Sequence, residues 1–521
     1  MTASGMDAMQ RRLNVLVVVL CVLAGLVLAR TLFLVAYRGE LAKQWTSNRF
    51  EHAFALPPRR GEIFDRDGKR IAANRKVHAL LLYDPAECAE KLDASALARL
   101  GLGLTAEDVE QLRRTRRDDM PVAFTQDTEA VGNLERALQE LGCSSRRERV
   151  WRRDYPLGRS VQFVSGAVNV WGVGAAGVEG QFEAELAGRN GLRRYLADGS
   201  GALVRMLEER GAVHGRDIHL SLSVGLSTEL EALLREPCRR ASAVRCMAIV
   251  ADAGCGEILA AVKADTREWD GLTKYLEPGT RGSATFVENK FESTGLALLL
   301  RAADAMEQGR REVGKEYLRR AARIAVEGKD ALPPRSLPGP GERGLSTICG
   351  KLGVLEPTGI ELPAEAHSIC GDGATDSIRI TPIKIVQVIA VMAGSGQLAP
   401  LTVLDGRREN PVPAQQQNVA RSVLSAETAA ALAREFVAMA KQSGLSRIEG
   451  GEVGAFPFSG QGIAFGRSYA IAGQVGFGKS NVGRRVVVMF VVHVHPEERD
   501  VAPALTREIF GGTLLAALQY F

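Results

Sequence analysis

The stretch Met247-Ala-Ile-Val-Ala-Asp-Ala-Gly-Cys-Gly-Glu-Ile-Leu-Ala-Ala-Val262 decides the fold of the larger part of this chain. Two aliphatic runs flank a glycine-containing turn, a pattern that predicts a β-hairpin. A long aliphatic run at 485–493 predicts a late strand. Four helices are predicted between them, at 295–309, 311–327, 381–394 and 425–442. Helices that lie in sequence between an early hairpin and a late strand favour the α+β class, with an antiparallel sheet flanked by helices.

The composition is that of an ordinary globular protein. The chain has 521 residues, of which 46% are hydrophobic and 24% are charged, so wholesale disorder and collagen-like repeats are excluded. This length is enough for roughly two to four domains. The formal net charge is only +5, and no long basic run is interleaved with aromatic residues, so we do not expect a nucleic-acid partner.

One segment departs from this average. Residues 13–37 carry no charge apart from Arg30 and are mostly apolar, and a helix of about 20 such residues crosses the roughly 30 Å core of a bilayer. Two arginines precede it, as the positive-inside rule favours at the cytoplasmic end. We predict a cytoplasmic tail at 1–12, a single-pass anchor at 13–37 in the bacterial inner membrane, and a body outside the cytoplasm. The alternative, a cleaved signal peptide, lacks a small-x-small cleavage site before the polar stretch at Arg38.

The cysteines give a second indication of compartment. The chain has eight, too scattered for a disulfide framework and without a Cys-x-x-Cys pair, so a zinc knuckle is not expected. Seven of them follow the predicted anchor and would meet an oxidising compartment. Their pairing cannot be deduced from the sequence.

Short motifs in a fixed order cover most of the chain. Arg60-Gly-Glu-Ile-Phe-Asp-Arg66 follows the anchor, Asp154-Tyr-Pro-Leu-Gly158 and Gly177-Val-Glu179 come next, and Thr358-Gly-Ile-Glu-Leu-Pro-Ala-Glu365 and Ile380-Thr-Pro382 come later. In this order they resemble the class B penicillin-binding proteins, the single-pass D,D-transpeptidases of peptidoglycan synthesis.

The resemblance implies a domain plan and a set of partners. It implies a pedestal domain of the dimerisation type at 38–215 and a transpeptidase-like, penicillin-binding domain at 216–521. It also implies contact with a polytopic membrane glycan polymerase and with other cell-wall synthesis or division proteins, and it makes peptidoglycan stem peptides candidate ligands. Whether the role belongs to cell division or to elongation and cell shape stays open.

The motifs that carry transpeptidase chemistry are missing. Acyl transfer needs a nucleophile, a base that activates it and a preorganised oxyanion site. The family supplies these with Ser-x-x-Lys at a helix start, Ser-x-Asn, and Lys-Thr-Gly on a strand, and the chain contains none of the three. Loss of one such partner typically lowers the rate by orders of magnitude. We therefore expect an inactive transpeptidase fold without a metal or another cofactor.

Two registers place the lost nucleophile. In the first, Phe291-Glu-Ser-Thr-Gly295 and the helix after it match the family without gaps, so Gly295 replaces the serine and Leu298 replaces the lysine. In the second, Thr280 stands at the nucleophile and Ser283 at the lysine. We favour the first because the following helix matches.

The other two motifs are harder to place. The third is expected at Phe458-Ser459-Gly460, ahead of a strand at 468–472, or alternatively at Gln474-Val475-Gly476, and both lack the lysine. The Ser-x-Asn segment cannot be placed, with Ser336 and Ser346 as loose candidates.

Three other patterns are weaker. Gly473-Gln-Val-Gly-Phe-Gly-Lys-Ser480 matches the P-loop, but a strand-like run follows where a helix must begin, so we interpret it as a glycine-rich hairpin turn. Gly172-Val-Gly-Ala-Ala-Gly177 matches the dinucleotide pattern but overlaps a family motif. His493 and His495 alternate on one strand, and no third metal ligand is in view.

Three functions remain to be compared. The first is a non-catalytic scaffold of the peptidoglycan machinery. The second is residual D,D-transpeptidase or carboxypeptidase chemistry with atypical residues, namely Thr280, Ser283 or Ser459. The third is binding of stem peptides or glycan strands in the cleft that the three catalytic motifs line in the family.

Overall fold

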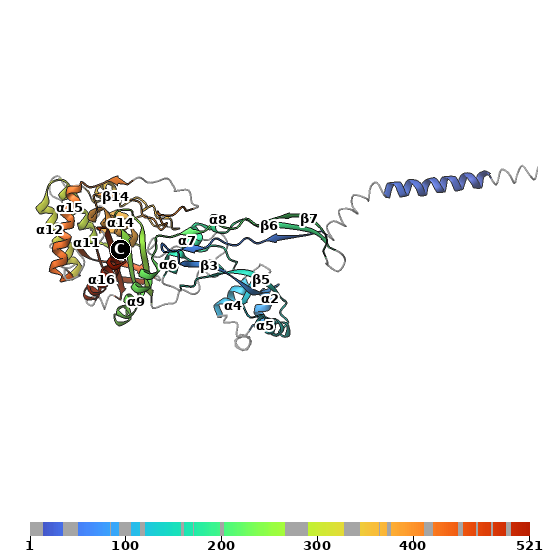
Figure 1. The fold of residues 1–521 in the computed structure, drawn as a ribbon, viewed down its shortest axis with the longest axis horizontal. Helices are drawn as coiled ribbons and strands as arrows, with labels where there is room; N and C mark the ends of the chain where they lie inside the picture. The colour runs from blue at the N-terminus through green and yellow to red at the C-terminus, as the bar shows by residue number, and fades with distance from the viewer. Residues whose placement is uncertain are drawn as a thin grey trace, which may run out of the picture. The chain divides into compact units, whose positions relative to one another are not determined.

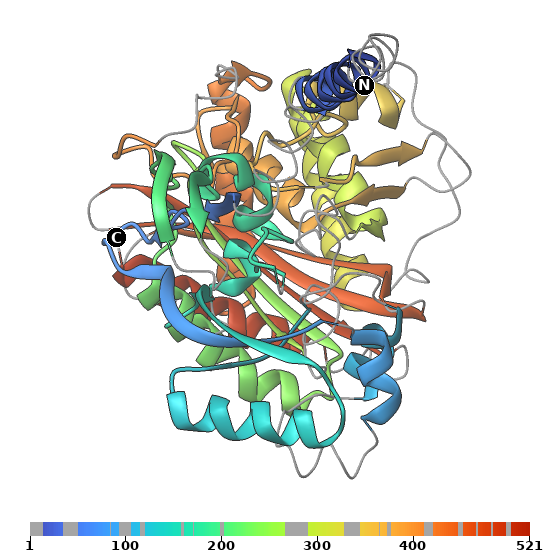
Figure 2. The same ribbon diagram turned by 90° about the vertical axis from the view of Figure 1, so that its right-hand side faces the viewer.

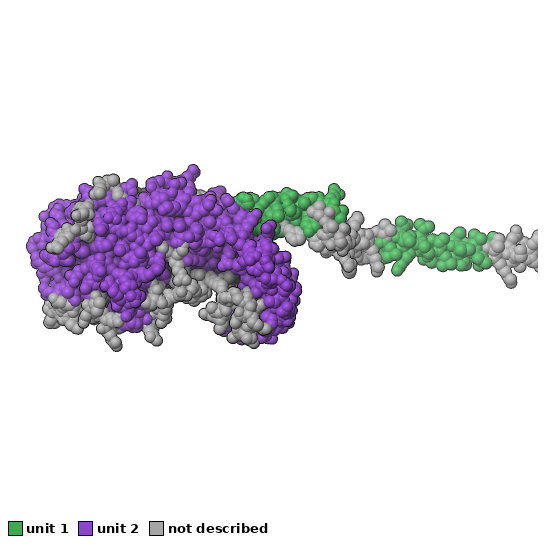
Figure 3. Space-filling model, turned by 60° about the horizontal axis from the view of Figure 1, so that its bottom comes forward, with its two compact units in different colours: residues 1–58, 188–214 green, residues 59–187, 215–521 purple. Residues whose placement is uncertain are grey.

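The structure of the protein is a computed structural model. It describes residues 14–34, 51–83, 85–92, 106–114, 120–157, 161–169, 171–197, 203–265, 290–327, 344–363, 365–371, 377–410, 420–445, 452–464, 467–480, 483–495 and 502–520. The chain forms two compact units, coloured separately in Figure 3. The first unit comprises Met1–Pro58 and Gly188–His214, and the second comprises Arg59–Ala187 and Gly215–Phe521. The predicted division into domains at 215 stays a prediction.

The first unit contains the N-terminal helix and a narrow sheet. The helix spans Asn14–Leu34, and it is the one helix in the described part of the chain that is long and apolar enough to cross a membrane. The sheet has the order β1 (Glu51–Leu56), β6 (Gly191–Ala197) and β7 (Leu203–Arg210), all antiparallel. Cross-strand ion pairs such as Arg193–Glu209, with a nitrogen–oxygen distance of 2.5 Å, join β6 to β7.

Within the second unit, residues 70–154 build what we call the small lobe. Strand β3 (Arg70–Leu82) pairs with β4 (Met120–Thr125) on one side and with β5 (Ser145–Asp154) on the other. Apolar side chains such as Leu80, Val122 and Leu138 form its core. Helices α2 (Pro85–Lys91), α4 (Ala106–Arg114) and α5 (Thr128–Glu140) contribute to this core. The sheet continues through β2 (Ile63–Phe64), which pairs with β8 (Ile218–His219).

The small lobe corrects one expectation from the sequence. The sequence, which is charge-rich there, predicts that residues from about 88 to 145 are helical, yet β4 lies among the helices and β5 follows them. The sequence does not predict strand β5, because its residues, Ser-Arg-Arg-Glu-Arg-Val-Trp-Arg-Arg-Asp, lack the apolar alternation of a half-buried strand.

The large antiparallel sheet of the second unit confirms the predicted α+β class. It brings the early hairpin β9–β10 beside the late strand β18, although more than 200 residues separate them in sequence. Its spatial order in the described residues is β10 (Ile258–Asp265), β9 (Arg245–Asp252), β18 (Arg485–Val494), β17 (Arg467–Lys479), β16 (Val453–Ala464), β11 (Phe291–Ser293), β13 (Ser377–Ile380) and β12 (Ile369–Gly371).

Both faces of this sheet are covered by helices, as Figure 2 shows. Side chains of β9 alternate between two cores: Met247 and Ile249 belong to one cluster, and Cys246, Ala248 and Val250 to the other. The first cluster takes in α11 (Thr294–Glu307), α12 (Arg311–Glu327), α13 (Leu345–Lys351), α14 (Pro382–Ala393) and α15 (Ala426–Gln442). The second takes in α9 (Val224–Arg240) and α16 (Ala502–Gln519). Short elements complete the unit: α6 (Gln162–Ser165), α7 (Gly177–Gln181), α8 (Glu183–Leu186), β14 (Gln397–Leu398) and β15 (Arg421–Ser422).

Three disulfides cross-link the second unit. Cys88 pairs with Cys143 in the small lobe, and the other bonds are Cys238–Cys246 and Cys349–Cys370. Cys21 and Cys255 are free thiols. This degree of pairing is typical of a protein that folds in an oxidising compartment.

Candidate functional site

The start of helix α11 is the first half of the candidate site. Strand β11 pairs with both β13 and β16 and leads directly into α11, whose N-cap is Ser293. The Ser293 hydroxyl accepts a hydrogen bond from the amide of Leu296 at 3.2 Å. Gly295 and Leu298, the positions expected to replace serine and lysine, therefore lie in the first two turns of a capped helix, and both are buried.

Helix α12 covers this first turn. Helices α11 and α12 are joined by a tight turn at Gly309, where φ is 77°, so α12 runs back along α11. Its C-terminal half reaches the N-terminus of α11: a Cβ atom placed on Gly295 would lie 3.7 Å from the carbonyl oxygen of Ala321. Ala321 and Ile324 are themselves buried. A side chain at position 295 would thus meet the backbone of α12.

Strand β16 forms the second half of the site. The Ser293 hydroxyl donates a hydrogen bond to the carbonyl oxygen of Ser459 at 2.6 Å, and the Ser459 hydroxyl donates to the carbonyl oxygen of Ile324 at 3.3 Å. Gly460 allows close approach of β11, because a Cβ there would lie 2.3 Å from the carbonyl oxygen of Glu292. The structure therefore brings Gly295, Ser459 and Gly460 to one place.

A buried aromatic ring stands beside Ser459. Phe458 is 1% exposed and stacks on Phe291 with 5.7 Å between the ring centroids. Its ring lies over Gly473 of the next strand, where a Cβ atom would come within 2.1 Å of it. In the preferred register this position would carry the lysine of the third motif, so an apolar ring fills the place of a charge.

The edge of β16 that follows Ser459 and Gly460 is paired with strand β11. Phe291 and Glu292 of β11 pair with Gly462 and Gln461. An extended peptide that adds to a sheet needs a strand edge with free backbone donors and acceptors. At Gln461 and Gly462 the protein's own strand takes that place.

The remaining sequence candidates lie elsewhere or outside the described residues. Thr280, Ser283 and Ser336 lie outside them, and Ser346 is in α13. Val475 of the alternative third motif is fully buried on β17, which is paired on both sides, by β16 and β18. Gly473 to Lys479 also belong to β17, so the predicted hairpin turn was wrong for them: the turn comes later, near Gly483.

The nucleotide and metal patterns do not assemble a site in the described part of the chain. Strand β18 follows the P-loop pattern, as expected, and the dinucleotide pattern leads into α7, which is five residues long. His493 is buried on β18, whereas His495 packs edge-on against Tyr469. The described residues hold no group of three or more His, Cys, Asp or Glu side chains that could bind a metal ion.

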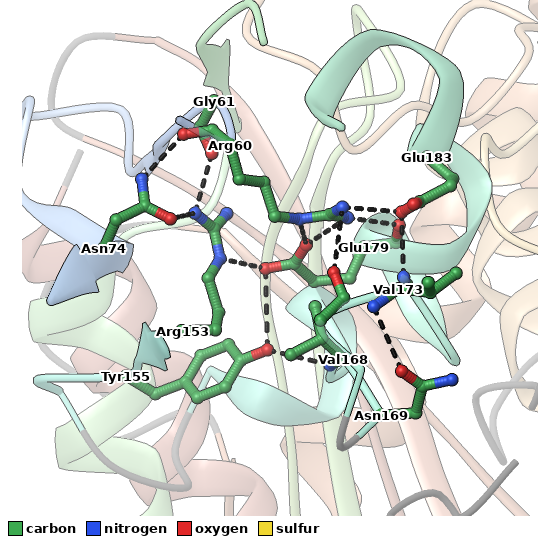
Figure 4. Close-up of polar contacts among 12 residues, drawn as sticks. Arg60, Gly61, Asn74, Arg153, Tyr155, Val168, Asn169, Val173, Glu179 and Glu183 are labelled. Atoms are coloured by element: carbon green, nitrogen blue, oxygen red, sulfur yellow. Dashed lines mark hydrogen bonds and ion pairs between the residues drawn. The ribbon is translucent and has the colours of Figure 1, made fainter. Parts of the chain in front are cut away.

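A second cluster of functional interest joins the other motifs around Glu179 (Figure 4). Glu179 is fully buried, and its carboxylate accepts hydrogen bonds from Arg60 at 2.8 Å and from Arg153 at 2.5 Å. Arg60 also pairs with Glu183 at 2.6 Å, and the Tyr155 hydroxyl lies 3.5 Å from Glu179. Two guanidinium groups are therefore matched by two carboxylates. We call these residues the Glu179 cluster.

Electrostatics keep the Glu179 carboxylate ionised. Burial alone would raise the pKa of Glu179, but the positive charges of Arg60 and Arg153 outweigh it and lower the pKa. Burial raises the pKa of Tyr155, and the nearby Glu179 adds to this, so the phenol stays protonated. The groups that remain charged are paired and hydrogen-bonded, which is the condition for holding charge in a protein interior.

The cluster fixes the small lobe to the rest of the second unit. Arg153 is the penultimate residue of strand β5, and its guanidinium donates to the carbonyl oxygen of Gly61 at 2.7 Å. Asn74 on β3 donates to the carbonyl oxygen of Arg60 at 2.6 Å. The sequence motifs indicated Arg60, Tyr155 and Glu179 but missed Arg153, which directly precedes the Asp154 motif and could have been found there. The arrangement is structural, because each charged group contacts protein atoms.

Comparison with known proteins finds a family model for one domain of the chain and relatives that match longer parts of it. The family model for the penicillin-binding protein dimerisation domain matches residues 55–220. A probable peptidoglycan D,D-transpeptidase, PenA, of Neisseria gonorrhoeae is 27% identical over 286 residues, which cover 52% of this chain and 49% of the relative. The probable peptidoglycan D,D-transpeptidase PbpC of Pseudomonas aeruginosa is 23% identical over 449 residues, 78% of each chain. The match to PenA thus spans about half the length of that relative.

Solved structures share the fold. A peptidoglycan synthetase from Bifidobacterium adolescentis superposes with a TM-score of 0.60 at 18% identity, covering 90% of this chain and 97% of that one. Penicillin-binding protein 2X from Streptococcus thermophilus gives a TM-score of 0.54 at 16% identity, covering 89% and 81%. These structures establish the shared fold. The matched dimerisation domain and the peptidoglycan D,D-transpeptidase relatives place the chain in the class B penicillin-binding protein family.

Proposed function

We propose that the chain is a membrane-anchored, non-catalytic component of peptidoglycan synthesis that serves as a scaffold for a membrane glycan polymerase and other cell-wall proteins. The observation that carries this proposal is the state of the nucleophile position. Gly295 offers no hydroxyl, Leu298 offers no amine, and both lie buried at the start of α11, whose first turn is covered by α12.

The remaining parts of an acyl-transfer site support the same conclusion. Catalysis of this kind needs a base within hydrogen-bond reach of the nucleophile. Of the three candidate nucleophiles, Thr280, Ser283 and Ser459, only Ser459 lies among the described residues. Its hydroxyl donates a hydrogen bond to a backbone carbonyl oxygen in α12. Its neighbours Phe458 and Gly460 have no group that could accept a proton. Residual chemistry at Ser459 therefore has little support, and Thr280 and Ser283 lie outside the described residues.

The proposed location rests on two features. The helix Asn14–Leu34 has the length and apolarity of a bilayer span. The three disulfides are typical of a body that folds outside the cytoplasm. By resemblance to the family, the anchor and the dimerisation-type domain would contact a polytopic glycan polymerase, in division or in elongation.

Labelling with a fluorescent penicillin tests the loss of catalysis. The full chain in membranes should not be acylated, and turnover of a D-Ala-D-Ala peptide should equal the rate without protein. The variants Thr280→Ala, Ser283→Ala and Ser459→Ala should behave identically. Specific acylation that saturates and disappears in one of these variants would overturn the proposal and identify the nucleophile.

The scaffold role needs a separate measurement. Membranes that contain the tagged full chain should yield a glycan polymerase in stoichiometric amounts after cross-linking. A matched variant in which residues 13–37 are replaced by an unrelated single-pass helix should lose much of this polymerase. Equal recovery with both anchors would argue against contact through the anchor helix, and no recovery with either would argue against the scaffold role.

A further inference from the structure

Strand β5 of the small lobe combines an open edge with a high density of arginine. It pairs with β3, and no other described strand pairs with it. Five of its ten residues are arginine and two are acidic, in a chain whose net charge is only +5. Arg153 is buried in the Glu179 cluster, whereas the other four are exposed: Arg146, Arg147, Arg149 and Arg152.

Two of these arginines are without partners in the part of the chain that the structure describes. Arg146 pairs with Glu148 at 3.4 Å, and Arg152 stacks over the ring of Phe124 at 4.2 Å. Arg147 and Arg149 make no ion pair, side-chain hydrogen bond or ring contact with described residues. Their two charges are therefore available to an external group.

The unpartnered arginines share one face of the strand with an exposed tryptophan. Side chains two residues apart point to the same side of a strand, so Arg147, Arg149 and Trp151 form a row along β5. Trp151 is 38% exposed, and Lys76 of the neighbouring strand lies over its ring at 4.8 Å. The row thus offers two cations and one apolar surface, spaced for contact with an extended chain.

An open edge strand also presents unpaired backbone N–H and C=O groups. A second copy of this chain is a poor occupant, because pairing β5 with itself would bring the arginines of two strands together. A segment with acidic residues at alternate positions would instead place carboxylates opposite the arginines and satisfy the backbone groups in the same step.

We propose that β5 is a docking strand for an extended acidic segment of a partner protein, which adds to the sheet of the small lobe. Carboxylates two residues apart in the partner would face Arg147 and Arg149, and an apolar side chain two residues further would face Trp151. Figure 1 shows β5 beside β3 in this lobe. The inference does not rest on the proposed loss of catalysis, because an acylating protein could use the same edge.

Binding of synthetic peptides to the full chain tests the proposal. The chain is reconstituted into phosphatidylcholine nanodiscs at about 0.15 M salt, where long-range charge effects are screened. A fluorescent ten-residue peptide of alternating Thr and Glu should bind, as measured by anisotropy, whereas the alternating Thr and Lys peptide should not. The Thr–Glu peptide with alternate backbone nitrogens methylated keeps its charge but loses strand pairing, and should bind at least about tenfold more weakly.

Variants separate this edge from bulk charge. The exposed double variant Arg147→Glu/Arg149→Glu should weaken Thr–Glu binding by about tenfold or more. The matched control Arg239→Glu/Arg240→Glu changes the same charge at the exposed end of α9 and should leave binding unchanged. Arg147→Ala/Arg149→Ala gives a milder second variant should the charge reversal disturb folding, which circular dichroism would reveal.

Four results would overturn the proposal. These are absence of peptide binding, equal binding of the methylated peptide, and equal loss in the α9 control. The fourth is displacement of the peptide by phosphatidylglycerol vesicles but not by excess unlabelled Thr–Glu peptide, which would assign the arginines to an anionic membrane. None of these results depends on penicillin labelling, so the two proposals can fail separately.

Discussion

The Glu179 cluster and the start of α11 both gather residues from distant parts of the second unit, yet they are built in opposite ways. In the cluster, buried charges are kept and matched, with Arg60 and Arg153 on either side of one carboxylate. Around the start of α11, the positions predicted to correspond to the family's catalytic groups are Gly295 and Leu298 on the helix and Phe458 on β16, and all three are uncharged and buried. The contrast teaches that one buried site in this unit is held together by matched charges and the other by apolar packing and hydroxyl hydrogen bonds.

The largest expected effect breaks the first half of this comparison. Replacing Glu179 by Ala leaves two buried arginines without their carboxylate, and should destabilise the second unit by roughly 4–5 kcal/mol. Denaturant unfolding of the detergent-solubilised chain measures this. The exposed pair of Glu208 with Arg194 provides the control, and Glu208→Gln should change the free energy of unfolding by about 0.5 kcal/mol or less. A small effect of Glu179→Ala would mean that the cluster does not hold the small lobe.

The second prediction addresses the apolar side. Phe458→Ala removes a ring that stacks on Phe291 and fills the space over Gly473, and should destabilise the chain by about 3–4 kcal/mol. Phe458→Leu keeps most of the apolar volume and should lose about 1.5 kcal/mol or less. If Phe458→Lys were as stable as the native protein, the site would tolerate the lost charge and the contrast with the Glu179 cluster would fail.

A buried charge outside both sites sharpens the comparison through its pH dependence. Lys384 is buried, and its amine donates hydrogen bonds to the amide oxygen of Gln387 at 2.7 Å and to the carbonyl oxygen of Gly353 at 3.3 Å. Unlike Arg60, it has no hydrogen-bonded carboxylate among the described residues. Burial therefore lowers its pKa from 10.5 to about 8.

The sign of the effect follows from proton binding. Between pH 8 and 10.5 the unfolded chain binds the proton and the folded chain does not, so the stability of the folded state rises with pH. We expect a gain of roughly 2–3 kcal/mol across this window, measured by unfolding at each pH. Lys384→Met should remove this part of the pH dependence. An identical pH profile for the variant would show that Lys384 does not titrate in that range.

The smallest expected effect concerns the link between β16 and α12. Ser459→Ala removes the hydrogen bond to the carbonyl oxygen of Ile324 and should lower the free energy of unfolding by about 1 kcal/mol. Ser422→Ala is a matched control, because its hydroxyl also donates to a carbonyl, that of Leu424, but from an exposed strand. There we expect about 0.5 kcal/mol or less. A larger loss of function than of stability at Ser459 would favour residual chemistry.

Sequence reasoning found the elements with strong apolar periodicity. The ends of α12 and α15 were predicted to within about one residue, because each carries a continuous apolar stripe and clear terminal residues. It failed at β5, where arginines replace the apolar alternation, and at residues 473–479, where a glycine-rich pattern suggested a turn. Between β16 and β17, the ring of Phe458 lies over Gly473 and the ring of Phe477 lies over Gly454, so these glycines serve cross-strand packing.

The candidate site divides in the same way. The sequence predicts that Gly295 and Leu298 replace the serine and the lysine, because the helix after them matches the family without a gap, and this stays a prediction. The contact of Ala321 with Gly295, and the hydrogen bond of Ser459 to Ile324, could not, because they depend on the path of α12 after the turn at Gly309. The pairing of the cysteines could not be predicted either, because it depends on how segments apart in the sequence pack together.

By itself, the sequence determined the α+β class, the apolar N-terminal segment and the absence of the three catalytic motifs, since these are properties of local periodicity and of residue identity. Only the tertiary structure decided what surrounds Gly295 and Ser459. Helix α12, the ring of Phe458 and strand β11 meet there because packing and strand pairing join residues far apart in the chain. The same holds for Arg60 and Glu179, which are 119 positions apart and meet because burial of each charge requires the other.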